Sequence, residues 1–125
     1  MLLDTNIVIH ACQPGSEWLS EWTDNPAASI ASVTRIEALG FHGISREEED
    51  AIRRFLTDSI CYALDDAVIE RAISLRQSRK MGAMDAIIAA TALEYGLMLV
   101  TRNVDDFKHV AGLQLVNPFN PSTLQ

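Results

Sequence analysis

The sequence predicts an α/β fold in which a mainly parallel central sheet of four to five strands is flanked by helices. Short apolar segments of strand length alternate along the chain with longer segments of helical periodicity. This alternation implies crossover connections, which join parallel strands and place helices on both faces of a sheet. The predicted strands are residues 2–3, 28–31, 60–64, 97–100 and, as the fifth, 113–116.

The first predicted strand ends at Asp4, and residues 6–10 continue with helical or mixed periodicity. Ser16 can cap a short helix over residues 17–22. On that helix Trp18 and Trp22 are four residues apart, a spacing that favours packing along the helix over a platform for stacking bases.

Capping-box spacing predicts the next two helices. Thr34 is followed three residues later by Glu37, and this helix is expected to run to Gly43. Ser45 and Glu48 repeat the spacing at the start of a second helix.

Two helices are predicted in the second half of the chain. Asp65 or Asp66 caps the first, and residues 85–96 form a very apolar second helix that Gly96 closes. A short turn is expected over residues 103–107. The stripe of the first helix that is predicted to face inward consists of Val68, Ile69, Ala72, Ile73 and Leu75.

The composition is typical of a soluble globular protein. The chain has 125 residues, of which 48% are hydrophobic and 22% charged, so residues 1–125 are expected to form one domain with a loosely ordered tail from about 117. Cys12 and Cys61 have neither disulfide-framework nor zinc-site spacing. Without an apolar run of about 18 residues or a secretory signal, a cytoplasmic protein with no membrane association is expected.

The net charge of −7 argues against a general electrostatic grip on nucleic acid. It does not exclude a nucleic-acid substrate, because divalent cations bound at an acidic site invert the local charge. Arg79, Lys80 and Arg102 also lie close in sequence to acids that are candidates for such a site.

Four acids stand apart from the solvated helix faces. Asp4 ends a strand, Glu37 lies in the first turn of a helix, Asp85 starts an apolar helix, and Asp106 follows the fourth strand. Because a parallel sheet gathers strand ends and helix starts at one edge, these residues are expected to meet there. Clustered carboxylates stay ionised together when cations bind between them, and oxygen ligands favour Mg²⁺ or Mn²⁺.

Each acid taken alone also has a structural interpretation. Asp4 can cap the following helix, and Glu37 can complete a capping box with Thr34. Asp85 can interact with the positive end of a helix dipole, and Asp106 can belong to an ordinary turn.

Together, four sequence motifs resemble those of the PIN-domain ribonucleases, in particular the VapC-like toxins of bacterial type II toxin-antitoxin modules. The motifs are Asp4-Thr5-Asn6, Thr34-Arg35-Ile36-Glu37, the segment from Met84-Asp85 to Val100-Thr101-Arg102-Asn103, and Asp105-Asp106-Phe107. The resemblance implies a three-layer α/β fold and a metal-dependent endoribonuclease that hydrolyses RNA phosphodiester bonds with Mg²⁺ or Mn²⁺.

Carried over by position, Asp4 and Asp85 resemble the principal metal ligands of the family, and Glu37 and Asp106 resemble the acids that complete the catalytic site. Asn6 and Thr101 match polar residues that support the cluster. Many relatives have an acid where this chain has Asn103, which puts a full second metal site in doubt and gives Asp106 more of the fourth-acid role.

The mechanism implied by the resemblance is metal-assisted hydrolysis, in which a cation activates water and stabilises the charge developing on the phosphate. Arg102, Arg79 and Lys80 are candidates for binding flanking phosphates, and their alternative interpretation is as solvated ends of a strand and a helix. The implied partners are an RNA substrate, a cognate antitoxin protein and a second copy of the chain in a homodimer.

Three other classes of protein share part of this sequence pattern. An aspartate-based phosphatase also begins with a strand and an aspartate, but it requires an acid at the position of Asn6. A receiver-like domain has an acidic pocket, but this sequence has neither the paired acids expected after the first strand nor the lysine expected after the last. A PIN-like interaction module with weakened or lost catalysis stays open because of Asn103.

Overall fold

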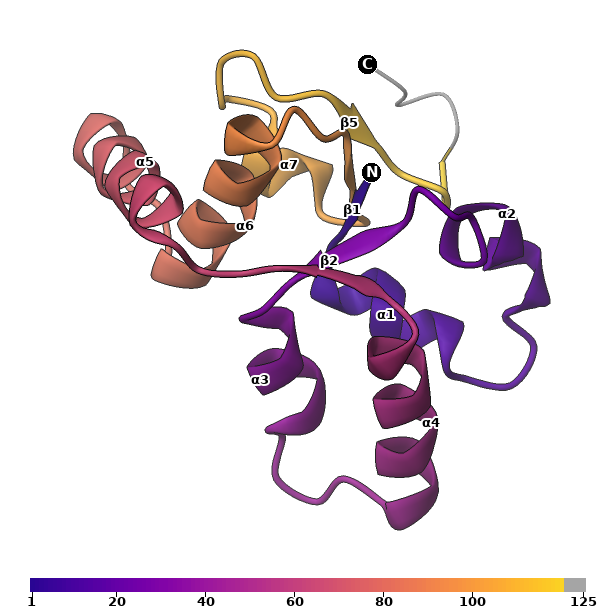
Figure 1. The fold of residues 1–125 in the computed structure, drawn as a ribbon. Helices are drawn as coiled ribbons and strands as arrows, with labels where there is room; N and C mark the ends of the chain where they lie inside the picture. The colour runs from indigo at the N-terminus through magenta and orange to yellow at the C-terminus, as the bar shows by residue number, and fades with distance from the viewer. Residues whose placement is uncertain (121–125) are drawn as a thin grey trace.

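The computed structural model describes residues 1–120, which form a parallel five-stranded sheet flanked by helices, as predicted (Figure 1). The spatial order of the strands is β3-β2-β1-β4-β5, so the N-terminal strand is central. The strand bounds are β1 Leu2–Leu3, β2 Ser29–Ala31, β3 Ile60–Tyr62, β4 Leu99–Val100 and β5 Leu115–Val116.

The register of the central strands brings distant segments together at one edge. Leu2 pairs with Leu99 and Leu3 with Val100, so the residues that follow β1 and β4 leave the sheet side by side. The backbone N–H of Asp4 donates to the carbonyl of Val100 at 2.9 Å, which extends this pairing to the edge itself. Ligands of open parallel sheets bind at such an edge.

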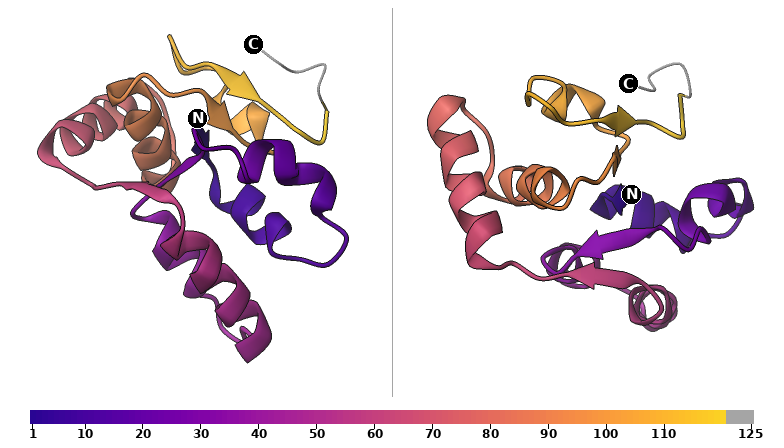
Figure 2. Two further views of the ribbon diagram at one scale, coloured as in Figure 1. Left: turned by 45° about the vertical axis from the view of Figure 1, so that its right-hand side comes forward. Right: turned by 45° about the horizontal axis from the view of Figure 1, so that its top comes forward.

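Alternate strand residues face two separate cores, which gives the domain three layers. One core joins Leu2, Leu99 and Leu115 to residues of α6 and α7, and the other joins Leu3 and Val100 to α1, α3 and α4. Figure 2 shows the helices on opposite sides of the sheet. The helix bounds are α1 Thr5–Ala11, η1 Glu17–Leu19, α2 Ser20–Thr23, α3 Thr34–Leu39, α4 Arg46–Thr57, α5 Asp66–Ser78, α6 Ala83–Glu94 and α7 Val104–Phe107.

Of the two predicted capping boxes, one is present in the structure and the other is absent. The box of Ser45 and Glu48 is present at the start of α4. The box of Thr34 and Glu37 was wrong, because Val33 occupies the N-cap position of α3 without a side-chain hydrogen bond. That helix also ends at Leu39 rather than reaching Gly43.

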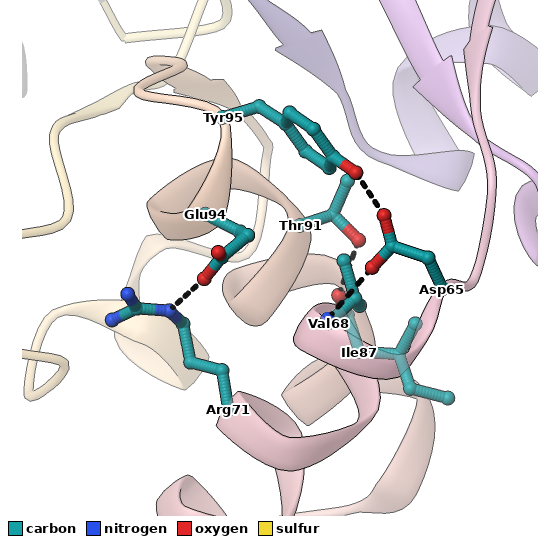
Figure 3. A network of polar contacts seen from close by, with 7 residues as sticks. All are labelled: Asp65, Val68, Arg71, Ile87, Thr91, Glu94 and Tyr95. Atoms are coloured by element: carbon teal, nitrogen blue, oxygen red, sulfur yellow. Dashed lines mark hydrogen bonds and ion pairs between the residues drawn. The ribbon is translucent and has the colours of Figure 1, made fainter.

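Helix α5 packs on α6 in the outer layer, and polar contacts connect the two (Figure 3). Asp65 caps α5 by accepting from Val68 N at 2.9 Å, and the Tyr95 hydroxyl also donates to its carboxylate. Arg71 pairs with Glu94 at 2.8 Å.

The predicted inward stripe of α5 was partly wrong. Val68 and Ala72 are buried, but Ile69 and Ile73 are 38% and 44% exposed. The reason is that α5 contacts its neighbour mainly through small residues of α6, Ala86 and Ala90, so only a narrow face of α5 is covered.

Among the described residues no helix is long and apolar enough to cross a membrane. The first part of the predicted tail, residues 117–120, is described, and there Asn117 accepts a hydrogen bond from the backbone N–H of Phe119 at 2.9 Å. The remaining part of that prediction, residues 121–125, lies outside the described residues.

Candidate active site

Asp4 sits where β1 turns into α1, with 7% of its surface exposed. The structural interpretation of this residue is confirmed, because Asp4 caps α1, and its role as a site residue stays a prediction. Its Oδ1 accepts from Thr5 N at 2.8 Å, and its Oδ2 accepts from Thr101 Oγ1 at 2.8 Å. Hydrogen bonds from the first residue of α1 and from the residue after β4 therefore fix both oxygens of this carboxylate in one orientation.

Glu37 reaches the same edge from α3. Its Oε1 accepts from Thr5 Oγ1 at 2.8 Å, a contact between residues 32 positions apart. The Thr5 hydroxyl also lies 3.3 Å from Thr34 Oγ1. The carboxylate predicted to close a capping box thus points toward the residue after Asp4.

Asp85 and Asp106 complete the cluster from the first turns of α6 and α7. The Asp85 carboxylate is close enough to Asp106 and Glu37 to be destabilised by their charges, and Asp4 is affected in the same way by Asp85 and Glu37. The four acids, here called the acidic site, therefore act on one another electrostatically although they come from four separate segments. None of the ion pairs within residues 1–120 involves any of them.

The pKa values of the two central acids reflect this environment. Burial raises the pKa of Asp4, the hydrogen bonds from Thr101 and Thr5 oppose that rise, and the charges of Asp85 and Glu37 add to it. Burial likewise raises the pKa of Asp85, and the charges of Asp106 and Glu37 raise it further. Such shifts from burial and like charge are typical of functional sites.

The three residues predicted to support the site are at its margin. Thr101 is fully buried and donates to Asp4. Asn103 donates its backbone N–H to Thr101 Oγ1 at 3.0 Å, and its carbonyl accepts from Asp106 N at 3.0 Å, so it shapes the turn that carries Asp106. Asn6 accepts from the backbone N–H of Arg102 at 3.5 Å, and within residues 1–120 its side chain forms no hydrogen bond with an acid.

The predicted phosphate-binding residues lie at two separate places. Arg79 and Lys80 line an open pocket of about 580 Å³ together with Asp85 and Asp106. Arg102 follows Thr101 and places its guanidinium beside His10, 3.2 Å away, and over the ring of Phe119. Basic side chains are therefore found at two points next to the acidic site.

The donor set suits a hard divalent cation that keeps part of its water shell. Carboxylate oxygens are the preferred ligands of Mg²⁺, which is usually held by one or two carboxylates plus water and substrate phosphate. Within residues 1–120, no three Asp, Glu, His or Cys side chains converge closely enough to hold an ion alone. The like charges at Asp4 and Asp85 and this spacing fit a water-rich Mg²⁺ or Mn²⁺ site rather than a closed structural one.

The fold and the site define the class of protein. The PIN domain family model matches residues 1–113, so the chain belongs to the PIN-domain family. Ribonuclease VapC1 of Rickettsia felis is 27% identical over an alignment of 128 positions that covers 93% of this chain and 94% of that relative.

Solved structures give the same result. A chain of a toxin-antitoxin complex from Klebsiella pneumoniae is 32% identical with a TM-score of 0.76, covering 94% of this chain and 96% of that one. VapBC2 from Rickettsia felis, bound to a DNA fragment from their promoter, contains a chain that shares the fold, with a TM-score of 0.77 at 23% identity over 93% of this chain and 96% of that one.

Sequence reasoning missed residues whose contacts emerge only from the fold. Thr5 connects Asp4 to Glu37, and the signal available was its hydroxyl between two predicted site residues. Arg76 and His109 line the same pocket as Asp85, and both ring nitrogens of His109 are buried without a partner among residues 1–120. No sequence signal marked these two residues.

Proposed function

We propose that this protein is a Mg²⁺- or Mn²⁺-dependent endoribonuclease and the toxin of a toxin-antitoxin pair. The observation that carries the proposal is the acidic site, in which four carboxylates from distant segments lie near enough to one another for their charges to interact and form no ion pair among residues 1–120. Asp4 is buried and Asp85 half-buried, and neighbouring carboxylates repel both, an arrangement that a bound cation would stabilise.

Asp4 and Asp85 are the residues that would hold the cation directly, with Glu37 and Asp106 completing its surroundings through water. A bound divalent ion supplies an activated water and stabilises charge on the phosphate. Thr101 and Thr5 orient the Asp4 and Glu37 carboxylates, as their 2.8 Å hydrogen bonds indicate. Oriented ligands are held near the productive geometry without reorganisation.

The substrate is RNA, and the expected products carry a 3′-hydroxyl and a 5′-phosphate. Arg79 and Lys80 line the same pocket as Asp85 and would bind phosphates flanking the scissile bond. Arg102, on the Thr101 side of the site, would bind the backbone at a second point. These positions compensate locally for a chain whose net charge is −7.

The proposed partners are a cognate antitoxin and a second copy of the chain, acting in the cytoplasm. Support for the antitoxin comes from the relatives, because the similar chains in Klebsiella pneumoniae and Rickettsia felis occur in toxin-antitoxin complexes. The homodimer rests on resemblance to the family.

The test is cleavage of total bacterial RNA by purified protein with Mg²⁺, Mn²⁺ or EDTA. The wild type is expected to cleave only with a divalent ion, and Asp85→Asn is expected to reduce the rate by more than about 100-fold, beyond the effect of losing an outer-shell residue. Asp50→Asn, on the exposed face of α4, is the matched control and retains activity. Cleavage in EDTA, or full activity in Asp85→Asn, would contradict the proposal.

A further inference from the structure

Beside the acidic site, four side chains from four segments form a compact group. Phe119, after β5, contacts the ring of His10 with centroids 5.0 Å apart and the ring of Trp18 at 4.9 Å. The guanidinium carbon of Arg102 lies 4.5 Å from the centroid of the Phe119 ring. These residues, His10, Trp18, Arg102 and Phe119, are called the aromatic–arginine cluster below.

The cluster adjoins the acidic site through the backbone. Arg102 directly follows Thr101, whose hydroxyl holds Asp4, and the Arg102 N–H points to the side chain of Asn6 at 3.5 Å. Arg102 is therefore the member of the cluster that a nucleotide flanking a phosphate at Asp4 would meet.

Arg102 keeps an unpaired charge. The ion pairs of residues 1–120 involve other cations, and within this range the Arg102 side chain contacts an imidazole nitrogen and an aromatic ring. An arginine held in place by ring stacking but without a carboxylate is arranged to receive an anion.

The two tryptophans differ in their surroundings. Trp22 packs against the core that contains α1 and α4, whereas Trp18 remains 50% exposed although its ring edge meets Phe119. If the cluster served only to hold the segment after β5 against the domain, the half-buried rings of His10 and Phe119 would suffice. The exposed half of Trp18 beside an unpaired guanidinium matches the combination of ring surface and positive charge that binds single-stranded nucleic acid.

We infer that the aromatic–arginine cluster is a base-stacking subsite, in which Trp18 stacks on a nucleobase adjoining the scissile phosphate and Arg102 binds that nucleotide's phosphate. The inference rests on the proposed ribonuclease function and adds a recognition element to it. An RNA strand is favoured over a protein segment because the cluster is continuous with the acidic site and carries a cation next to its rings.

Fluorescence of Trp18 tests the stacking directly. The chain has two tryptophans, so Trp22→Phe leaves Trp18 as the only one, and Asp85→Asn in the same chain prevents cleavage. Oligoadenylate is expected to quench the emission of this double variant with saturation, whereas an oligomer of abasic ribose phosphates binds without quenching. Equal quenching by both, or by neither at saturating binding, overturns the inference.

Kinetics separate the subsite from the active site. Trp18→Ala is expected to lower kcat/KM on single-stranded RNA by about 5- to 150-fold, the range for losing one stacked base, while Trp18→Phe retains most of the activity. Phe41→Ala removes an exposed ring of the loop after α3 and serves as control.

Arg102→Gln is expected to reduce the salt dependence of RNA binding by about one phosphate contact, whereas Trp18→Ala is expected to leave the salt dependence unchanged.

The outcomes distinguish this inference from the proposed function. An inactive wild type refutes the ribonuclease and the subsite together. An active wild type with unchanged RNA kinetics in a folded Trp18→Ala protein refutes the subsite alone, as does a Trp18→Ala effect limited to binding of a protein partner.

Discussion

The acids at the edge of the sheet and the acids between α5 and α6 have opposite environments within one small domain. Between the helices, Asp65 is bound by Tyr95 and by the start of α5, and Glu94 pairs with Arg71 (Figure 3). At the sheet edge, Asp4 accepts from the Thr101 hydroxyl, and both Asp4 and Asp85 have neighbouring carboxylates but form no ion pair within residues 1–120.

The pKa values follow the same division. Hydrogen bonds from Tyr95 and Val68 lower the pKa of Asp65, whereas burial and like charge raise the pKa values of Asp4 and Asp85. A domain of net charge −7 therefore lowers the pKa of an acid that holds helices together and raises the pKa values of two acids at one edge of its sheet. Asp65 therefore stabilises the fold, whereas Asp4 and Asp85 are arranged for binding a ligand.

Binding of Mg²⁺ is expected to give the largest difference between the two regions. At a concentration 100 times its dissociation constant, Mg²⁺ should raise the free energy of unfolding of the wild type by about 2.7 kcal/mol. Asp4→Asn should lose this gain, and Asp65→Asn should keep it while starting from a lower stability. Urea unfolding with and without Mg²⁺ measures both. An equal gain in the free energy of unfolding in the two variants would contradict the proposed difference between the two regions.

The threonine that orients Asp4 should have a smaller effect. Thr101→Val removes the hydroxyl that donates to Asp4 Oδ2 and is expected to weaken Mg²⁺ binding by about 10- to 100-fold, as for other groups that orient ligands. Thr101→Ser restores the donor and should restore affinity.

Thr91 offers a matched control for that substitution. It is also buried, but its hydroxyl donates to the carbonyl of Ile87 within α6. Thr91→Val should therefore leave Mg²⁺ affinity unchanged in calorimetric titrations. Similar losses in Thr101→Val and Thr91→Val would mean that the effect reflects general packing.

The smallest predicted effect is a difference in the sign of pH dependence, measured in EDTA. Because the folded-state pKa of Asp4 is raised, its contribution to stability is present below its unfolded pKa and is lost as pH rises through the folded pKa. Because the folded-state pKa of Asp65 is lowered, its contribution is present above its unfolded pKa and is lost as pH falls through the folded pKa.

Unfolding of wild type, Asp4→Asn and Asp65→Asn from about pH 3 to about pH 8 measures these contributions. The stability difference between wild type and Asp4→Asn should move against the wild type as pH rises, and that for Asp65→Asn should move in its favour. Differences of the same sign would show that the two regions do not differ electrostatically.

Much of the fold and the gathering of the acids followed from the sequence, because alternating strands and helices define a parallel sheet whose strand ends must share an edge. Asp4 and Asp85 could be placed there from their positions in the segments. Hydrogen bonds between residues far apart in the chain could not be predicted from the order of strands and helices. The spacing of Thr34 and Glu37 suited a local cap, yet Glu37 binds Thr5, a partner that α1 and α3 bring together only in the folded chain.

Apolar spacing also has limits as a guide to burial. It marked Ile69 and Ile73 as inward because it shows which residues share a helix face, not how much of that face a neighbour covers. The same limit applies to Trp18 and Trp22, which lie four residues apart: Trp22 packs against the core, whereas Trp18 stays 50% exposed and contacts Phe119 from the far end of the chain.

Carbon-13 NMR titration of the aspartate side-chain carboxyls, with and without Mg²⁺, tests the central claim most directly. Without the metal, Asp4 and Asp85 should titrate above the ordinary range for aspartate, and Asp65 below it. Mg²⁺ should lower the pKa values of Asp4 and Asp85 and leave that of Asp65 unchanged. Ordinary pKa values for Asp4 and Asp85 that do not respond to Mg²⁺ would contradict the account.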